Sequence, residues 1–364
     1  MTNGMKRFTS LAHRYKRGLT GMFRKIKIQL IRVLRSKRFY FILSGLVFIA
    51  VLPLFISSEY VIGEVLVPMI IFAIYASSWN LLAYSGQGSL GHAAFLGIGG
   101  FTSALLAIKL GVPPIAGLFI GGLFSAAIGF LIGLTCVRLK AWFLGMVTFG
   151  FSVIALTLIS QFDSVIGGIM GFRTPLIVPR GVPFYYFTFA IAAISILAIY
   201  LIMKSKLGLA FKAIRENELE AKMTGINTGK YRLIAFVLST FFAGLAGGLY
   251  AQSIRYIHVS VFEPHFSFLP LMICVIGGLG TIQGPLIGSV IIVSIDAYLP
   301  RIDPLLQGLM GSLFPAVSNV GPPMRMMLLG VILLVVVIFA PKGITSLISK
   351  TYAYLRRKKK EVKP

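Results

Sequence analysis

The sequence predicts an all-α membrane protein that crosses the bilayer several times. Of its 364 residues, 57% are hydrophobic and only 12% are charged, and the mean hydropathy is +0.89. So much apolar surface does not fit inside one soluble core. The apolar residues also gather in runs of about 20, the length that an α-helix needs to cross a hydrocarbon layer. We therefore expect a polytopic helical protein.

The apolar runs extend over most of the chain and predict about ten membrane elements. They occupy residues 39–57, 61–84, 88–110, 113–137, 143–162, 183–203, 231–253, 266–299 and 324–341. The run at 266–299 contains Gly277, Gly278, Gly280 and the pair Gly284–Pro285. Because glycine and proline weaken or end a helix, we expect two short elements there. Some of the membrane elements should therefore be short or broken glycine-rich helices.

The basic residues indicate which side of the membrane each loop faces. Residues 1–38 contain twelve Lys and Arg and no acid, seven more lie between Lys204 and Arg232, and the tail has RRKKK at 356–360. Cytoplasmic loops carry such an excess. We therefore expect both termini in the cytoplasm. The net charge of +25 is also typical of nucleic-acid binding, but clusters beside apolar runs favour the membrane.

These patterns divide the chain into five parts. They are a basic cytoplasmic segment at 1–38, a first transmembrane half at 39–203, a cytoplasmic loop at 204–230, a second transmembrane half at 231–342 and a basic cytoplasmic tail at 343–364. The first part is either an amphipathic helix on the bilayer surface or a solvated tail. A faint similarity between glycine-rich stretches in the two halves predicts an internal repeat.

The motifs and residue types that the sequence lacks exclude some classes of transporter. Its one Gly-Lys pair, Gly229–Lys230, has neither the earlier Gly nor the following Ser or Thr of a G-x-x-x-x-G-K-[ST] phosphate loop. Ion-coupled carriers place carboxylates within the membrane, whereas Asp163 is the only acid between Val65 and Arg215, and Asp296 is the single acid within a later apolar run. We expect no catalytic residue, no metal site and no directly bound cofactor. A passive channel, or a permease driven by a separate subunit, remains.

A polar stretch between two apolar runs, Ser205–Asn227, carries closely spaced charges of both signs. Pairs four residues apart, such as Glu218 and Lys222, suit a surface helix, and Gly225 predicts where that helix ends. Taken alone, such a charge run is most often a solvated connection. Its order of residues is distinctive, however: Ser205, Gly208, Ala210, Ala213, Ile214, Arg215, Glu216, Asn217, Glu218, Gly225, Ile226 and Asn227.

This order resembles the ATPase-coupling loop of the LivM-type permeases, the branched-chain amino acid subunits of ABC importers. Leu209 stands where the family commonly has Arg, and in Leu219-Glu220-Ala221 the acid of the broader importer signature is displaced by one position. The resemblance implies that Arg215 and Glu218 anchor the loop. The coupling residues that it implies are Ser205, Gly208, Ala213, Ile214, Arg215, Glu216, Glu218, Gly225 and Asn227.

A second stretch, NLLAYSGQGSLGHAAFLGIGGF at 80–101, is similar to the most recognisable membrane segment of the same family. Small residues at this density let helices approach closely and expose backbone to a cavity. For His92 a helix-packing hydrogen bond competes with substrate contact, and Gly97, Gly99 and Gly100 suit packing. With the glycines of the 266–299 run, the candidate translocation pathway comprises Asn80, Gln87, Ser89, His92, Gly277, Gly278 and Gly280.

The resemblance implies a permease subunit of an ATP-driven importer for branched-chain amino acids, located in the inner (plasma) membrane of a bacterium. The partners that it implies are cytoplasmic ABC ATPases, which use the ATP, a second related permease and an extracytoplasmic substrate-binding protein. One alternative is the same class of importer carrying urea, short amides or other amino acids. Another is a passive channel or facilitator, which would need no ATPase and would show flux without ATP.

Overall fold

The computed structural model describes residues 49–56, 58–136, 139, 141–162 and 167–301, together with 327, 330, 331, 334, 335, 338 and 343–346. The chain divides into two compact units, Met1–Phe55 and Ile56–Pro364. In the first unit, residues 49–55 are helical. The predictions for residues 1–38, for most of 39–57 and 324–341, for Asp163 and for most of the basic tail lie outside the described residues.

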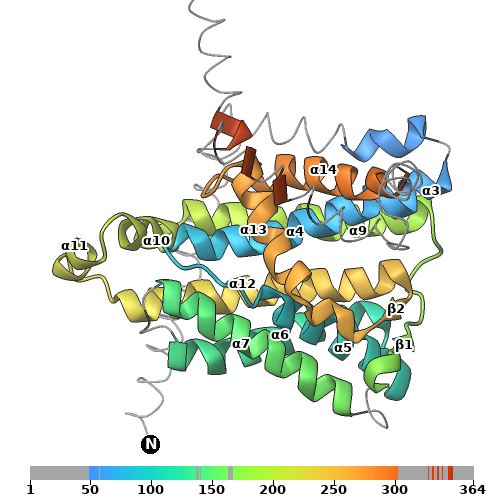
Figure 1. Ribbon diagram of the computed structural model, residues 1–364, viewed down its shortest axis with the longest axis horizontal. Helices are drawn as coiled ribbons and strands as arrows, with labels where there is room; N and C mark the ends of the chain where they lie inside the picture. The colour runs from blue at the N-terminus through green and yellow to red at the C-terminus, as the bar shows by residue number, and fades with distance from the viewer. Residues whose placement is uncertain are drawn as a thin grey trace, which may run out of the picture. The chain divides into compact units, whose positions relative to one another are not determined.

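The described part of the second unit consists almost entirely of helices (Figure 1). The first α-helix, α3 (Glu59–Val61), continues through a π-helical turn (Ile62–Leu66) into α4 (Val67–Tyr84). The α-helices that follow are α5 (His92–Lys109), α6 (Pro114–Cys136), α7 (Ala141–Gln161), α9 (Val182–Lys204), α10 (Lys206–Glu216), α11 (Glu218–Met223), α12 (Thr228–Ile254), α13 (Pro264–Gly277) and α14 (Gln283–Tyr298). Short 3₁₀ turns lie at Gly168–Met170, Val259–Phe262 and Leu299–Arg301.

Two very short strands pair loops that are distant in sequence. Strand β1 (Phe172–Arg173) is antiparallel to β2 (Tyr256–Ile257), with Phe172 opposite Ile257 and Arg173 opposite Tyr256. They join the connection before α9 to the connection after α12. This pairing lies at the end of the unit away from α10 and α11 (Figure 1).

Six helices of the described residues are long and apolar enough to cross a membrane: Glu59–Tyr84, His92–Lys109, Pro114–Cys136, Trp142–Gln161, Val182–Lys204 and Thr228–Ile254. The all-α polytopic class is therefore confirmed. The run at 266–299 forms two short helices, α13 and α14, as the glycines and the proline predicted. The count of about ten elements and the internal repeat stay predictions.

The core lies on α4 and α12. The most apolar window of the Glu59–Tyr84 helix is 72% buried and that of α12 is 67%, against 28% for the α7 helix. Large apolar side chains on α6 and α7, such as Leu123 and Trp142, are exposed. Lipid tails rather than protein would cover such side chains in a bilayer. The central helices thus pack on protein, and α6 and α7 present an apolar face outward.

Glycines bring α5, α6 and α12 into close contact. A Cβ atom on Gly99 would overlap the backbone of Gly244, one on Gly247 would overlap the carbonyl oxygen of Leu96, and one on Gly121 would crowd the Gly99 carbonyl. Small residues at membrane helix interfaces allow this approach of backbones. The expectation that Gly99 serves packing is confirmed.

We expect Gly247→Ala to destabilise the protein, because a methyl group there meets backbone that cannot rotate away. Overpacking of this kind costs about 1–3 kcal/mol, so the midpoint of thermal unfolding in mild detergent should fall by several degrees. Gly150→Ala is the matched control, since nothing lies within 4 Å of a Cβ atom at this helical position. Equal midpoints for the two variants would contradict the packing that we describe.

Candidate functional site

The stretch 205–227 forms two helices rather than the one surface helix that its charges suggested. Asn217 separates α10 from α11 with an extended backbone, and its Oδ1 accepts hydrogen bonds from the amides of Leu219 (3.1 Å) and Glu220 (3.4 Å). Its side-chain amide donates to Oε1 of Glu220 at 2.7 Å. Asparagine is among the best N-cap residues, so Asn217 ends one helix and starts the next.

The first helix turns sharply away from α9. Ser205 caps it, with its Oγ accepting from the amide of Leu207 at 3.1 Å. A Cβ atom on Gly208 would overlap the Met203 carbonyl. Ser205 and Gly208 therefore have structural reasons to be present: one satisfies an amide and the other permits the turn.

The second helix ends as the sequence predicted. Gly225 has a left-handed backbone with φ of 83°. Its amide donates to the carbonyl of Lys222, and the amide of Ile226 donates to that of Ala221, each at 3.0 Å. This pair of bonds is the Schellman arrangement. Asn227 then caps α12, since its Oδ1 accepts from an amide of that helix's first turn at 3.0 Å.

One face of α10 is buried against the transmembrane helices. Phe211 is fully buried and Ile214 is 3% exposed. Phe211 packs in an apolar cluster with Leu81 of α4, Met203 of α9 and Ala235 of α12. Burying these side chains fixes the rotation of α10 about its axis.

The other face of α10 and α11 combines apolar and charged side chains. Leu209, Leu219 and Met223 are 67%, 72% and 88% exposed. Charged side chains lie among them, including an ion pair of Lys212 with Glu216 at 3.5 Å. We define the α10–α11 surface as six of the exposed residues: Leu209, Lys212, Glu216, Leu219, Glu220 and Met223. Large apolar side chains rimmed by charges are typical of protein docking sites.

Glu218 fixes α11 to the start of α12. Its carboxylate lies 3.0 Å from Nζ of Lys222 and 2.9 Å from Nη2 of Arg232, and it accepts from the Thr228 hydroxyl at 3.3 Å. Partial burial works to raise the pKa of the Glu218 carboxyl, but the Lys222 hydrogen bond and the charges of Arg232 and Lys222 outweigh burial and hold that pKa below its ordinary value. The predicted pairing of Glu218 with Lys222 is confirmed.

Arg215 points back from α10 onto the transmembrane helices. Its guanidinium lies 5.4 Å from the centre of the Tyr84 ring, a cation–π contact. A Cβ atom on Gly280 would overlap its Nη1, and one on Gly86 would lie 3.1 Å from its Cα. Arg215 therefore touches the end of α4 and the turn between α13 and α14, and these two glycines leave room for it.

That turn is bonded to α4 by Asn80. The amide of Gly280 donates to Oδ1 of Asn80 at 2.8 Å, and Nδ2 of Asn80 donates to the carbonyl of Thr281 at 2.7 Å. Glycines shape the turn, with φ of 128° at Gly278 and 71° at Gly280. The candidate pathway residues Asn80, Gly278 and Gly280 thus meet at one place beside Arg215.

Gly277 has a packing contact of its own at the same hairpin. A Cβ atom there would overlap the carbonyl of Gly284. The glycines therefore hold α13 and α14 together near their turn.

Gln87 joins this junction from the connection between α4 and α5. Its Nε2 donates to the carbonyl of Arg232 at 3.0 Å and to the Ser85 hydroxyl at 3.1 Å, and the side chain is 4% exposed. The backbone carbonyl of Arg232 thus accepts a hydrogen bond from Gln87, while its guanidinium forms an ion pair with Glu218. The α10–α11 segment is connected in this way to the 85–91 connection as well as to α12.

Ser89 and His92 lie deeper and are fully buried. Nε2 of His92 lies 2.8 Å from the hydroxyl of Ser78, and the carbonyl of Ser89 accepts from the Trp79 indole at 2.7 Å. The helix-packing hydrogen bond weighed for His92 is therefore present. A role for either residue along a translocation pathway stays a prediction.

Sequence reasoning did not single out Arg232, Tyr84 or Thr281 for this junction. Arg232 counted only as one positive charge beside a membrane span, and no spacing rule relates it to Glu218 or Gln87. Tyr84 and Thr281 contact residues about 130 and 200 positions away, which no local pattern indicates.

Comparison with known proteins agrees with the sequence resemblance. A family model described as the branched-chain amino acid transport system permease component matches residues 61–337. The high-affinity branched-chain amino acid transport system permease protein LivM of Salmonella typhimurium is 27% identical over 288 residues, which are 71% of this chain and 67% of that protein. LivM of Escherichia coli gives the same identity and coverage. No solved structure matches this chain.

We expect Glu218→Gln to loosen α11, because it removes the charge that binds Lys222 and Arg232. Amide hydrogen exchange in α11 at pH 7 should become about fivefold faster, which is the increase expected when the ion pairs no longer contribute ~1 kcal/mol to the stability of this helix. Glu216→Gln is the control, since that carboxylate pairs only with the exposed Lys212 among the described residues.

The pH dependence follows from the lowered pKa of Glu218. The stabilisation that the Glu218 carboxylate contributes is complete above its pKa in the unfolded state, near 4.5. This stabilisation is lost as the pH falls through the lower pKa of the folded state. Exchange in wild-type α11, corrected for intrinsic rates, should approach that of Glu218→Gln over this range. Identical exchange in the two proteins at pH 7 would refute the anchor.

Proposed function

The chain belongs to the branched-chain amino acid transport permease family, and from this membership we propose that it is the membrane subunit of an ATP-driven importer of branched-chain, hydrophobic amino acids. The observation that carries the ATP-driven part is the α10–α11 surface. Its apolar side chains are exposed although the opposite face of α10 is buried and held in place. Such a fixed and partly apolar surface suits a protein partner.

The proposed partner at this surface is a cytoplasmic ATPase subunit. This assignment places α10 and α11 in the cytoplasm, in agreement with the basic residues around them, and it places both termini there too. The protein then lies in the inner membrane beside a second related permease, and a binding protein delivers the amino acid outside. The chain itself transports and does not hydrolyse ATP.

The contacts of Arg215 suggest how a push on the surface reaches the membrane. A shift of α10 moves Arg215 against Tyr84 and the Gly280 turn. Asn80 holds that turn on α4 with two hydrogen bonds. The short α13–α14 hairpin and α4 therefore move with α10, which is the kind of rigid coupling that alternating access requires.

We expect Leu219→Ser combined with Met223→Ser to release the ATPase while leaving the permease folded, since both side chains are exposed. Truncating a buried anchor at an interface commonly costs more than about 1 kcal/mol, so the pair should weaken association at least about tenfold. Tagged protein from native membranes, solubilised in mild detergent, would be assayed for the ATPase by mass spectrometry.

Met170→Ser is the matched control, because Met170 is 80% exposed but lies at the β1–β2 end of the unit. It should retain the ATPase. If wild-type protein carries no ATPase and passes amino acids without ATP, the protein is a channel and the proposal is wrong.

A further inference from the structure

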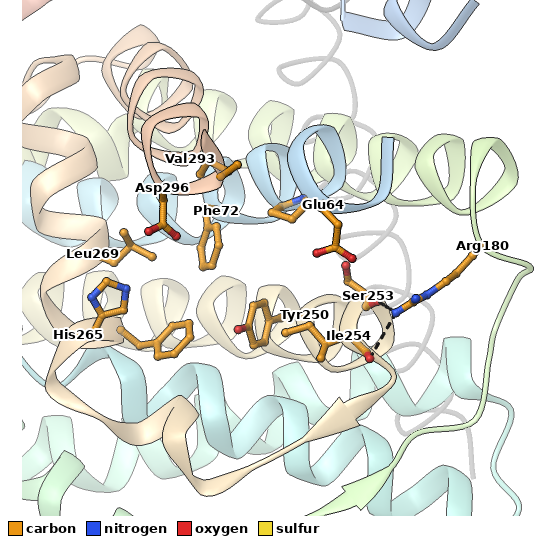
Figure 2. A pocket seen from close by; sticks show the side chains of 13 residues that line it. Glu64, Phe72, Arg180, Tyr250, Ser253, Ile254, His265, Leu269, Val293 and Asp296 are labelled. Atoms are coloured by element: carbon orange, nitrogen blue, oxygen red, sulfur yellow. Dashed lines mark hydrogen bonds between the residues drawn. The ribbon is translucent and has the colours of Figure 1, made fainter. Parts of the chain in front are cut away.

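A cavity of about 420 Å³ opens between α4, α12, α13 and α14 (Figure 2). Its volume lies within the roughly 300–1,000 Å³ typical of ligand sites. Glu64 at one wall precedes Tyr84 on the same continuous helix by 20 residues, which is about 30 Å along the axis. The cavity is therefore at the opposite end of the membrane helices from Arg215. On the proposed topology, it faces outward.

Two carboxylates from different helices point into this cavity. Glu64 lies on the π-helical turn before α4, and Asp296 lies near the end of α14 (Figure 2). The chain has 10 acids against 35 Lys and Arg, so two acids at one cavity are notable. Among the described residues neither carboxylate forms an ion pair. Both carboxylates are exposed, so they are accessible to a ligand that enters the cavity, and π-helical turns are frequent at functional sites.

One positive group lies at the rim. Nη2 of Arg180 donates to the carbonyls of Ser253 (2.9 Å) and Ile254 (3.4 Å) at the end of α12. These bonds hold the guanidinium beside the cavity, near Glu64 in Figure 2. Arginine presents five donors in a planar fork, so two bonds through one nitrogen leave donors that can reach a carboxylate.

The rest of the lining combines aromatic and apolar side chains with the polar groups of Tyr250, Ser253 and His265. The ring of Phe72 lies 5.7 Å from that of Tyr250 and 6.4 Å from that of Phe266, and those two rings are 5.4 Å apart. Leu269 and Val293 extend this wall. The cavity thus offers negative groups, a positive group and an apolar surface within one space.

We propose that this cavity binds an α-amino acid as a zwitterion on its way from the binding protein. Glu64 and Asp296 take the ammonium group, Arg180 takes the carboxylate, and the hydrocarbon side chain packs on Phe72 and Phe266. This inference rests on the proposed function, and it adds a site where the permease itself selects for amino acids. Urea and short amides lack the ammonium charge, so the two acids would discriminate against them.

The first test uses the complete transporter, with ATPases and binding protein, in proteoliposomes loaded with ATP. The double variant Glu64→Gln, Asp296→Asn removes both charges with little change of shape. Because charge-assisted hydrogen bonds are strong, maximal leucine uptake should fall at least about tenfold, while basal ATP hydrolysis continues. Glu59→Gln and Glu263→Gln are matched controls, since both acids are exposed near the same end of the helices but do not line the cavity.

The outcomes separate this inference from the proposed function. Uptake by the double variant within twofold of wild type overturns the cavity site and leaves the importer intact. If the wild-type complex shows no ATP-dependent uptake of any amino acid, the proposed function fails. If the double variant does not assemble, a second measurement decides.

That second measurement keeps both acids and places a reactive thiol in the cavity. Ser253→Cys lines it (Figure 2), and the native Cys136 and Cys274 are buried. We expect leucine to slow maleimide labelling of the new thiol, and 4-methylpentanoate, which is leucine without its amino group, to have no effect. Equal protection by both compounds, or protection by neither, overturns the assignment of the ammonium group to this cavity.

Discussion

The turn between α13 and α14 is the constraint on which the rest of the site depends. A break between two helices leaves backbone amides and carbonyls without helical partners. Asn80 meets this need for Gly280 and Thr281 with the two ends of one side-chain amide. Asn80 therefore satisfies the backbone at the break and also fixes the turn to α4. Because Gly280 has a positive φ and no side chain, it leaves room for the Arg215 guanidinium, which a Cβ atom there would overlap.

The two ends of the membrane helices differ in the groups that they present. At the α10 end, the inward face is buried and the outward face keeps Leu219 and Met223 exposed, so a partner can push on it without unfolding it. At the other end, α4, α12, α13 and α14 leave a cavity with Glu64 and Asp296. The π-helical turn and α4 form one continuous helix from Glu64 to Tyr84, whose ring contacts Arg215. A movement of α10 can thus alter the cavity through one rigid element.

Local pattern predicted much of this arrangement. Apolar runs located the six long helices, Gly284–Pro285 and its neighbours indicated the break, and Gly225 indicated the end of α11, because each depends on a few adjacent residues. The interruption at Asn217 was missed, since the charges on both sides suit one continuous helix. The bonds of Asn80 and Arg232, and the meeting of Glu64 with Asp296, join segments far apart in sequence. Only packing of the helices decides such pairs.

The central claim is that Arg215 transmits the movement of α10 to the α13–α14 turn. ATP hydrolysis and leucine uptake would be measured together in the reconstituted complex containing Arg215→Ala, which changes none of the six residues that define the α10–α11 surface. The account predicts that hydrolysis continues while uptake per ATP falls by at least about fivefold, the low end of typical coupling between sites. An unchanged ratio of uptake to hydrolysis would contradict it.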